Sequence, residues 1–187
     1  MKIKILVLFL TIGCMATAQK GKFSGVLSYP ILIGDNFVNT NYKGNIDLGA
    51  QYRFVTSEFL NLGISVNVGF YAFENENFTV QPDINGRFVH PRLFGELHVG
   101  RLRVQLGGGY GFTSFRTENA IGPGEVEKVR DNSDGVNING AISVDIVQGL
   151  FAMAQYDYIK IKTFGSLADT DFNRNIGLVK LGFGYRF

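Results

Sequence analysis

Apolar and polar side chains alternate with a period of two along most of the chain beyond residue 22. In "LNLGISVNVGF", every second residue from Leu60 to Phe70 is apolar, and Asn, Gly or Ser stand between them. Strict alternation is typical of a β-strand with one apolar and one polar face. The alternation predicts eight strands. They are expected at about Phe23–Ile33, Asn45–Phe54, Leu60–Phe70, Val89–Val99, Leu102–Phe112, Val136–Ile146, Leu150–Lys160 and Val179–Phe187.

The connections between these strands alternate between short and long. The tight turns are expected at Thr56–Glu58, Gly100–Arg101 and Gln148–Gly149. The long connections are expected at about Gly34–Asn41, Glu74–Arg87, Phe115–Gly135 and Lys162–Asn173. Short periplasmic turns and longer external loops alternate in this way in outer-membrane barrels. The pattern therefore predicts an all-β fold: an eight-stranded antiparallel up-and-down transmembrane β-barrel, with both termini on the periplasmic side.

The first 18 residues differ in kind from the rest. Lys2 and Lys4 precede the apolar stretch Ile5–Ile12, and the segment ends on small residues that include Ala18. A charged start, a short apolar stretch and a small-residue cleavage site are typical of a secretory signal peptide. We expect residues 1–18 to be the signal, cleavage between Ala18 and Gln19, and residues 19–187 to form the barrel domain in the cell outer membrane.

Composition and charge exclude several classes of function. Removal of the predicted signal leaves 16 basic and 16 acidic residues, so there is no basic surplus that would favour nucleic acid. The sole cysteine, Cys14, lies inside the signal, so the mature chain is expected to have no disulfide and no thiol chemistry. "TIGC" loosely resembles a lipoprotein signal, but Thr11 stands where that signal prefers Leu, so lipidation of Cys14 is the lesser alternative. No cofactor is expected.

A soluble eight-stranded barrel that binds an apolar ligand, as lipocalins do, is the rival architecture. Such a barrel keeps its apolar residues inside and shows a charged surface to water. Here the polar face is mostly Gly, Ser, Asn and Gln, and the apolar face is almost uninterrupted and ends in aromatic residues. A lipid-facing apolar band flanked by aromatic girdles has this composition, so the pattern favours the membrane barrel.

Three segments carry a resemblance to a known family. The export junction "ATAQ", the hairpin "VHPRLFGELHVGRLRVQLGGGYGF" and the C-terminal "LGFGYRF" resemble the OmpA-like and opacity-like eight-stranded outer-membrane barrels of Gram-negative bacteria. The resemblance covers the whole mature chain. It implies contact with outer-membrane lipids. It also implies that Phe183, Tyr185 and Phe187 form the signal read by the barrel-assembly machinery.

Alternation also predicts which charged residues point inward. The expected interior network comprises Arg53, Arg92, Glu96, Arg103, Asp145, Lys180 and Arg186. An eight-stranded barrel is just wide enough for side chains to fill, so a broad pore is not expected. The turn at Gly100–Arg101 would place Arg92 opposite Gly109 and Phe94 opposite Gly107. Replacing Lys180 is expected to be milder than placing a cation at the neighbouring, lipid-facing Leu181.

Strand Leu150–Lys160 is apolar on both faces, and its register follows from one residue. Tyr156 and Tyr158 are expected to point outward, because the opposite choice would turn Asp157 toward lipid.

Candidate catalytic groups are few. Some small barrels modify lipid with a histidine near the outer rim, and His90 is the candidate here, with Thr113 and Ser114 across the hairpin. No acidic residue is evident in sequence to orient it, so we expect a structural histidine. His98 lies near a periplasmic turn, at the wrong end for such work.

Calcium binding is suggested weakly by "DTDFN", which places Asp169, Asp171 and Asn173 at alternate positions. An EF-hand loop would need Gly and Glu where Arg174 and Lys180 stand, so a solvated loop is expected.

These observations predict a small, monomeric, non-enzymatic barrel whose specific role lies in its external loops. Adhesion, envelope maintenance and binding of an envelope partner all remain open, and the sequence identifies no external partner. A lipid-modifying enzyme and a carrier of small apolar molecules are the alternatives.

Overall fold

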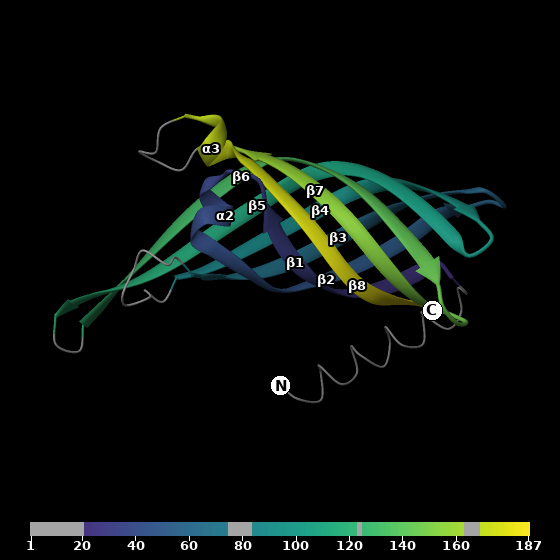
Figure 1. The fold of residues 1–187 in the computed structure, drawn as a ribbon, viewed down its shortest axis with the longest axis horizontal. Helices are drawn as coiled ribbons and strands as arrows, with labels where there is room; N and C mark the ends of the chain where they lie inside the picture. Colours follow the sequence, from purple (N-terminus) through teal and green to yellow (C-terminus); the bar gives the residue numbers. More distant parts are fainter. Residues whose placement is uncertain (1–20, 75–83, 123–124, 163–168) are drawn as a thin grey trace.

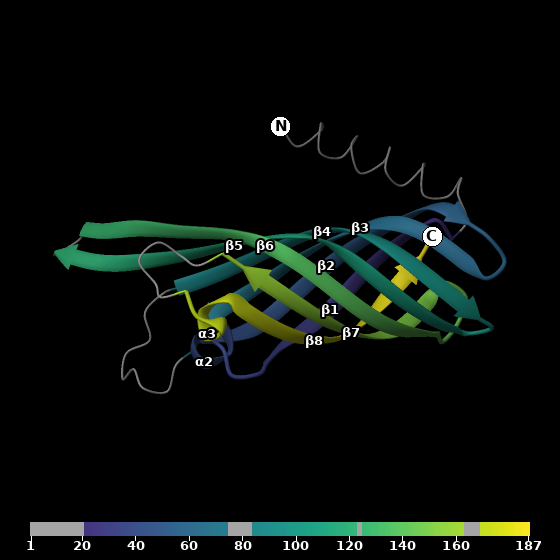
Figure 2. The same cartoon turned by 90° about the horizontal axis from the view of Figure 1, so that it is seen from above.

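The chain forms a closed barrel of eight antiparallel strands, each paired with its neighbours in chain order, and β8 closes onto β1 (Figures 1 and 2). This computed structural model describes residues 21–74, 84–122, 125–162 and 169–187. The strands are β1 Phe23–Ile33, β2 Tyr42–Thr56, β3 Leu60–Phe73, β4 Ile84–Val99, β5 Leu102–Gly122, β6 Glu125–Asp145, β7 Leu150–Ile161 and β8 Asn175–Arg186. The helices are α2 Phe37–Asn41 and α3 Asp171–Arg174. The predicted fold class is confirmed; the predicted signal peptide lies outside the described residues.

The two ends of the barrel differ in their connections. One end, called here the turn end, carries three short turns and the C-terminus, and the other, the loop end, carries α2 and α3 (Figure 1). At the turn end Gly100 has a φ of +61°, which a two-residue hairpin turn requires at its first position.

The C-terminal strand is held on both sides. β8 pairs with β1 from Ser24 opposite Arg186 to Ile33 opposite Gly177, and it also pairs with β7. At the last residue, Phe187 N donates to Phe23 O over 3.0 Å, and the two rings pack with centroids 5.6 Å apart. Closure of the barrel therefore explains why alternation is so regular at the end of the chain.

The predicted long connection Phe115–Gly135 is wrong for most of its length. β5 and β6 stay paired from Leu102 opposite Val144 up to Gly122 opposite Glu125. The hairpin projects beyond the rest of the loop end as an arm (Figures 1 and 2). In the sequence, the alternation of apolar and polar residues stops where the hairpin leaves the barrel, because a strand beyond that point has no face toward the barrel interior. Backbone pairing needs no such alternation.

The β4–β5 hairpin has the predicted register, with Arg92 opposite Gly109 and Phe94 opposite Gly107. Gly109 packs directly against the backbone oxygen of Pro91 and the side chain of Arg92. Its neighbour Gly108 faces outward, and a Cβ there would have Asn137 O, 3.8 Å away, as its nearest atom.

These two adjacent glycines provide a stability test. Gly109→Ala is expected to lower the free energy of unfolding by about 1–3 kcal/mol, because the new methyl would overlap the Pro91 carbonyl and force the backbone apart. Gly108→Ala, its matched control, is expected to be neutral or slightly stabilising. Urea titration of folded protein in lipid vesicles would compare them. Equal stability of the two variants would show that the β4–β5 packing is not as described.

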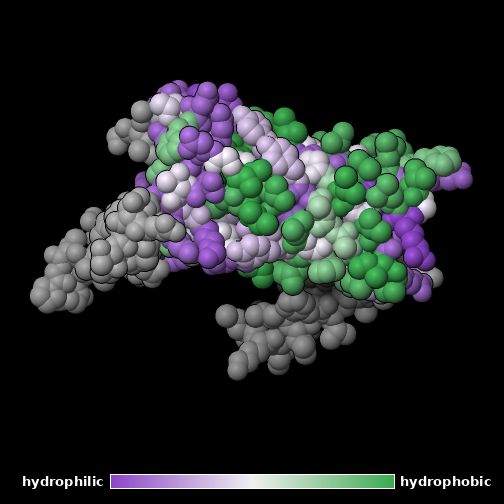
Figure 3. Space-filling view, viewed as in Figure 1, coloured by the Kyte–Doolittle hydropathy of each residue, from purple (hydrophilic) through white to green (hydrophobic). Residues whose placement is uncertain are grey.

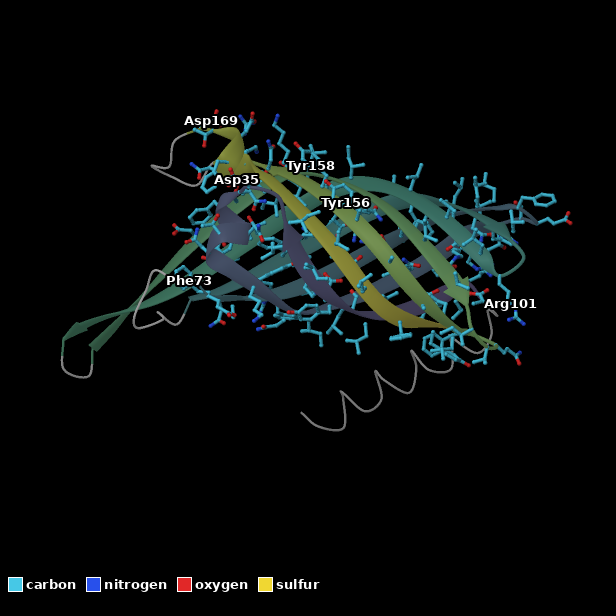
Figure 4. All side chains as sticks on the ribbon, in the orientation of Figure 1. Asp35, Phe73, Arg101, Tyr156, Tyr158 and Asp169 are labelled. Carbon is cyan, nitrogen blue, oxygen red and sulfur yellow. The ribbon has the colours of Figure 1, made fainter. Side chains whose placement is uncertain are left out.

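Strand β7 has the expected facing. Tyr156 and Tyr158 point away from the barrel and are partly exposed (Figure 4). Asp157, between them in the chain, is fully buried. The single carboxylate thus correctly set the register of a strand that is apolar on both faces.

Candidate functional site

The outer wall of the barrel is apolar over a band of constant height. The outward-facing residues of β5 run from Leu102, 45% exposed, to Phe112, 51% exposed. Those ten residue steps span about 25 Å along the barrel axis, at a rise near 2.5 Å per residue for a tilted strand. The band covers the same number of steps from Val136 on β6 to Ile146, the residue directly after that strand. Hydrophobic side chains gather toward the turn end, and hydrophilic ones toward the loop end (Figure 3).

The barrel interior carries charge where a soluble barrel would carry its apolar core. All seven residues of the predicted interior network point inward. Those nearest the turn end form a chain of ion pairs, called here the turn-end network: Arg53, Glu96, Arg103, Asp145 and Arg186.

Glu96 and Asp145 connect the arginines of the turn-end network. Glu96 accepts a two-pronged pair from Arg53, at 2.8 and 3.0 Å, and a third contact from Arg103 Nη1 at 3.1 Å. Asp145 pairs with Arg103 Nε at 3.4 Å and with Arg186. The Arg186 guanidinium also lies over the Phe151 ring, 3.8 Å from its centroid. Pairing of this kind lets several charges share a narrow interior.

A second group, called the mid-barrel network, consists of Asp47, Arg92, Asp157 and Lys180. Lys180 Nζ lies 2.6 Å from Asp47 Oδ2 and 2.9 Å from Asp157 Oδ2, and it has no exposed surface. Arg92 Nη1 pairs with Asp157 Oδ1 at 2.7 Å. Two cations therefore face two carboxylates, and the network is balanced. A hydrogen bond between Gln51 and Gln105 spans the interior between the two networks.

Asp47 was absent from the predicted network, although its position signals its direction. In "NIDLGAQYRF" it stands on the same face as Arg53, six residues away, between apolar neighbours. Alternation could therefore have identified it as inward. Its partner Lys180 is 133 residues away in the chain, so only barrel closure shows that they meet.

The predicted polar interior is only half right, because the loop end of the interior is apolar. A cluster of buried side chains fills it, and this cluster is called here the apolar plug. Its members are Leu32, Val38, Tyr42, Tyr71, Phe88, Phe115, Ile159, Ile161, Ile176 and Leu178. Val38 comes from α2, which folds over the barrel mouth with its N-terminus capped by the Asn36 side chain. The plug separates the charged interior from the loop end.

The plug leads to a prediction about transport. Purified protein in planar bilayers is expected to show no large, stable conductance, because packed side chains close the loop end and ion pairs fill the rest. Single-channel recording over repeated reconstitutions would check this. Reproducible porin-like openings would contradict it, and a bilayer that receives the same detergent without protein serves as the control for leak.

His90, the candidate catalytic histidine that the sequence predicts to be structural, meets no catalytic partner among the described residues. His90 is fully buried beneath the plug, and neither ring nitrogen has a hydrogen-bond partner among the described residues. Thr113 also faces inward, but its hydroxyl donates to Ser133 O at 3.0 Å, and Ser114 lies on the opposite face of β5. A nucleophile and base within hydrogen-bond reach, which acyl transfer needs, are not assembled around His90.

The other sequence candidates are engaged in structural contacts. Asp169 pairs with Arg174 at 2.8 Å, and Asp171 accepts from Asn175 Nδ2 at 3.2 Å. Within the described ranges, no three His, Cys, Asp or Glu side chains are grouped so that they could hold a metal ion. In the same part of the chain, no helix has the length and apolar character to cross a membrane.

The loop end carries exposed, paired charges. Lys43 pairs with Glu74 at 3.2 Å, and Lys162 Nζ lies 2.9 Å from Asp134 Oδ2. The hydrogen bond to the Asp134 carboxylate raises the pKa of Lys162 above its usual value. Asp35 and Asp169 lie at this end, and Arg101 lies at the opposite one (Figure 4).

Comparisons with known proteins show likeness in fold rather than in sequence. No family model matches the chain, and no curated protein matches it. The crystal structure of Ail, the attachment invasion locus protein of Yersinia pestis, is similar with a TM-score of 0.57 and 16% identity, over 90% of this chain and 100% of Ail. Neisserial surface protein A (NspA) gives a TM-score of 0.60 and 13% identity, over 88% of this chain and 96% of NspA.

A further similar structure is that of the Y. pestis outer membrane protein Ail in a phospholipid bilayer nanodisc. Its TM-score is 0.51, with 17% identity, over 90% of this chain and 100% of that protein. Strand number, antiparallel order and closure agree with these neighbours. The chain therefore has the fold of the eight-stranded outer-membrane β-barrels.

Proposed function

We propose that this protein is an integral outer-membrane barrel that acts without catalysis and presents its loop end outside the cell. One observation carries the proposal: the wall is apolar over about 25 Å, and the interior is charged. In water this arrangement would expose a large apolar surface to solvent and bury charged side chains, the reverse of what a soluble barrel does. In a bilayer the cost of the exposed wall disappears, because lipid tails cover it, and the interior charges are paired with one another. Both termini then lie in the periplasm.

The element that supports a binding role is the β5–β6 arm. Among the described residues, β4 pairs with β5 as far as Thr117, and β7 pairs with β6 down from Gly135, with one further backbone hydrogen bond from Lys162 N to Asp134 O. Beyond these positions, in the part of the chain that the structure describes, each arm strand pairs only with the other. Two free sheet edges displayed outside the membrane suit adhesion or binding of an envelope partner, because an exposed edge accepts an added strand.

The C-terminal aromatics support the proposed route of assembly. Phe183, Tyr185 and Phe187 are exposed on the outer wall at 60%, 47% and 43%, at the seam where β8 meets β1. A machinery that reads them before closure would find them on the lipid-facing side. We further propose that the mature protein begins at Gln19 and is a monomer in contact with outer-membrane lipids.

A shortened arm tests the binding role. Replacing residues 118–128 with an Asn-Gly turn would join Thr117 to Val129, which are opposite each other in the hairpin. The variant is expected to assemble in the outer membrane at the wild-type level and to lose adhesion of whole cells to surfaces or to other cells. Protease added to intact cells is expected to cleave the arm of the wild-type protein, because the arm is proposed to lie outside the outer membrane.

The control for this test is the Gly108→Ala variant, which changes the barrel wall and leaves the arm intact. If the shortened variant adheres as well as the wild type, the arm is not needed for adhesion and the proposed binding role is wrong. Recovery of the wild-type protein in the soluble periplasm would overturn the membrane placement itself.

A further inference from the structure

The turn-end network has an odd number of charges. Arg53, Arg103 and Arg186 supply three cations, and Glu96 and Asp145 supply two carboxylates. The ion pairs run in the order Arg, Glu, Arg, Asp, Arg, so each carboxylate is shared by two arginines. Every arginine thus has an acidic partner, but the network as a whole carries one net positive charge.

Neighbouring groups in the described part of the chain do not supply a further anion. The mid-barrel network is balanced, with two cations and two carboxylates. The backbone oxygen of Phe187 accepts a hydrogen bond from Gly21 N, and the Phe187 ring packs against Phe23 and Tyr185 on the outer wall. Among the described residues, Glu96 and Asp145 are the acidic groups that pair with these arginines.

The unbalanced charge lies where solvent enters the barrel. Exposure of the network side chains rises from 1% at Arg53 and 2% at Glu96 to 19% at Arg103 and 27% at Asp145. Two buried nitrogen atoms at the same end have no partner among the described residues: Arg186 Nε, on a side chain that is 7% exposed, and His98 Nδ1. His98 stands directly opposite Arg103 across the β4–β5 hairpin. A cation surplus and unused nitrogen positions thus occur together at one mouth.

We infer that the turn-end mouth of the barrel is a binding site for one oxyanion, a carboxylate or phosphate group, held chiefly by Arg103 and Arg186. Arginine matches both groups with paired N–H donors, and partial exclusion of water strengthens such contacts. If the protein spans the outer membrane as proposed, the mouth opens to the periplasm, and the bound group belongs to a periplasmic molecule. Binding at the mouth does not require that placement, so the two proposals fail separately.

The test uses the whole barrel folded in zwitterionic detergent micelles. Sodium phosphate and sodium acetate are titrated separately against sodium chloride at constant ionic strength, and amide NMR shifts of His98, Ser143 and Arg186 are followed. The wild type is expected to give saturable shifts at these residues. The anion that binds more tightly indicates whether the natural group is a phosphate or a carboxylate.

Three variants separate the site from general charge effects. Arg103→Gln balances the network, leaving an Arg–Glu and an Asp–Arg pair, and is expected to weaken binding at least tenfold. Arg101→Gln removes an equal charge from the exposed turn and is expected to bind like the wild type. Asp145→Asn increases the surplus and is expected to bind more tightly. A purely structural role for the network would not produce tighter binding when one of its ion pairs is lost.

The proposal is overturned if wild type, Arg101→Gln and Arg103→Gln show the same weak, unsaturated shifts, which would mean an adventitious ion only. It is also overturned if Asp145→Asn, with a wild-type amide spectrum, binds no more tightly than the wild type.

Discussion

Replacing Lys180 with leucine is expected to lower the free energy of unfolding by about 3–5 kcal/mol, the usual effect of removing one partner from a buried ion pair. Among the described residues, Lys180 is the only cation that contacts both Asp47 and Asp157. Its Nζ lies 2.6 Å from Asp47 Oδ2 and 2.9 Å from Asp157 Oδ2. Arg92 still pairs with Asp157 after the change, at 2.7 Å. Asp47 would keep neutral hydrogen bonds from Ser28 and Asn67 but have no cation. Reversible urea unfolding in lipid vesicles measures the change.

A double variant distinguishes loss of charge from loss of packing. In Lys180→Leu with Asp47→Asn, the orphaned carboxylate is replaced by an amide whose oxygen still accepts from Asn67. This double variant is expected to be more stable than Lys180→Leu alone, which gives a strongly non-additive cycle. If the two substitutions add, Lys180 contributes through packing and the proposed ion pairing is unimportant.

Replacing Leu181 with arginine is expected to destabilise the barrel by about 2–4 kcal/mol, the effect of a lipid-facing cation near the bilayer midplane. Leu181 is 50% exposed on the outer wall. Six residues separate it from Phe187, which places it about 15 Å above that end, near the middle of the apolar band. The same unfolding experiment in vesicles applies, with Leu181→Met as a volume-matched control that should lie within about 1.5 kcal/mol of the wild type.

The comparison of these neighbours tests the direction in which each faces. Lys180 lies at nearly the same depth as Leu181, so depth cannot explain why a cation is required at one position and harmful at the next. A harmless Leu181→Arg would mean that the wall is not lipid-facing, and the barrel would then be a soluble one with water around it.

The sequence alone predicted the reverse order of these two effects. Alternation places Lys180 inward, and with seven interior charges of both signs its loss looked like the loss of one pairing partner among several. The structure shows that two carboxylates pair with Lys180 and that its side chain has no exposed surface. The number of partners that one charge serves is a property of the closed barrel, which sequence spacing does not contain.

What the sequence determined by itself was everything that depends on local geometry. A strand alternates its side chains between two faces, so the pattern predicts strand number, the apolar wall and the inward direction of Arg53, Arg92 and Lys180. A two-residue turn sets register, so Arg92 opposite Gly109 was also predictable. One carboxylate, Asp157, was enough to orient β7.

Only the tertiary structure showed which side chains meet after the barrel closes. It also showed that the β5–β6 arm is paired although apolar and polar residues do not alternate there. Lys180 reaches Asp47 across 133 residues, and Phe88 meets Phe115 and Ile159 in a plug that no single strand reveals. The arm continues as paired strands because hydrogen bonding between backbones requires no apolar face, so its residues leave no periodic trace in the sequence. Periodicity records the surroundings of one strand, whereas contacts across a barrel depend on the shear and tilt that all eight strands adopt together.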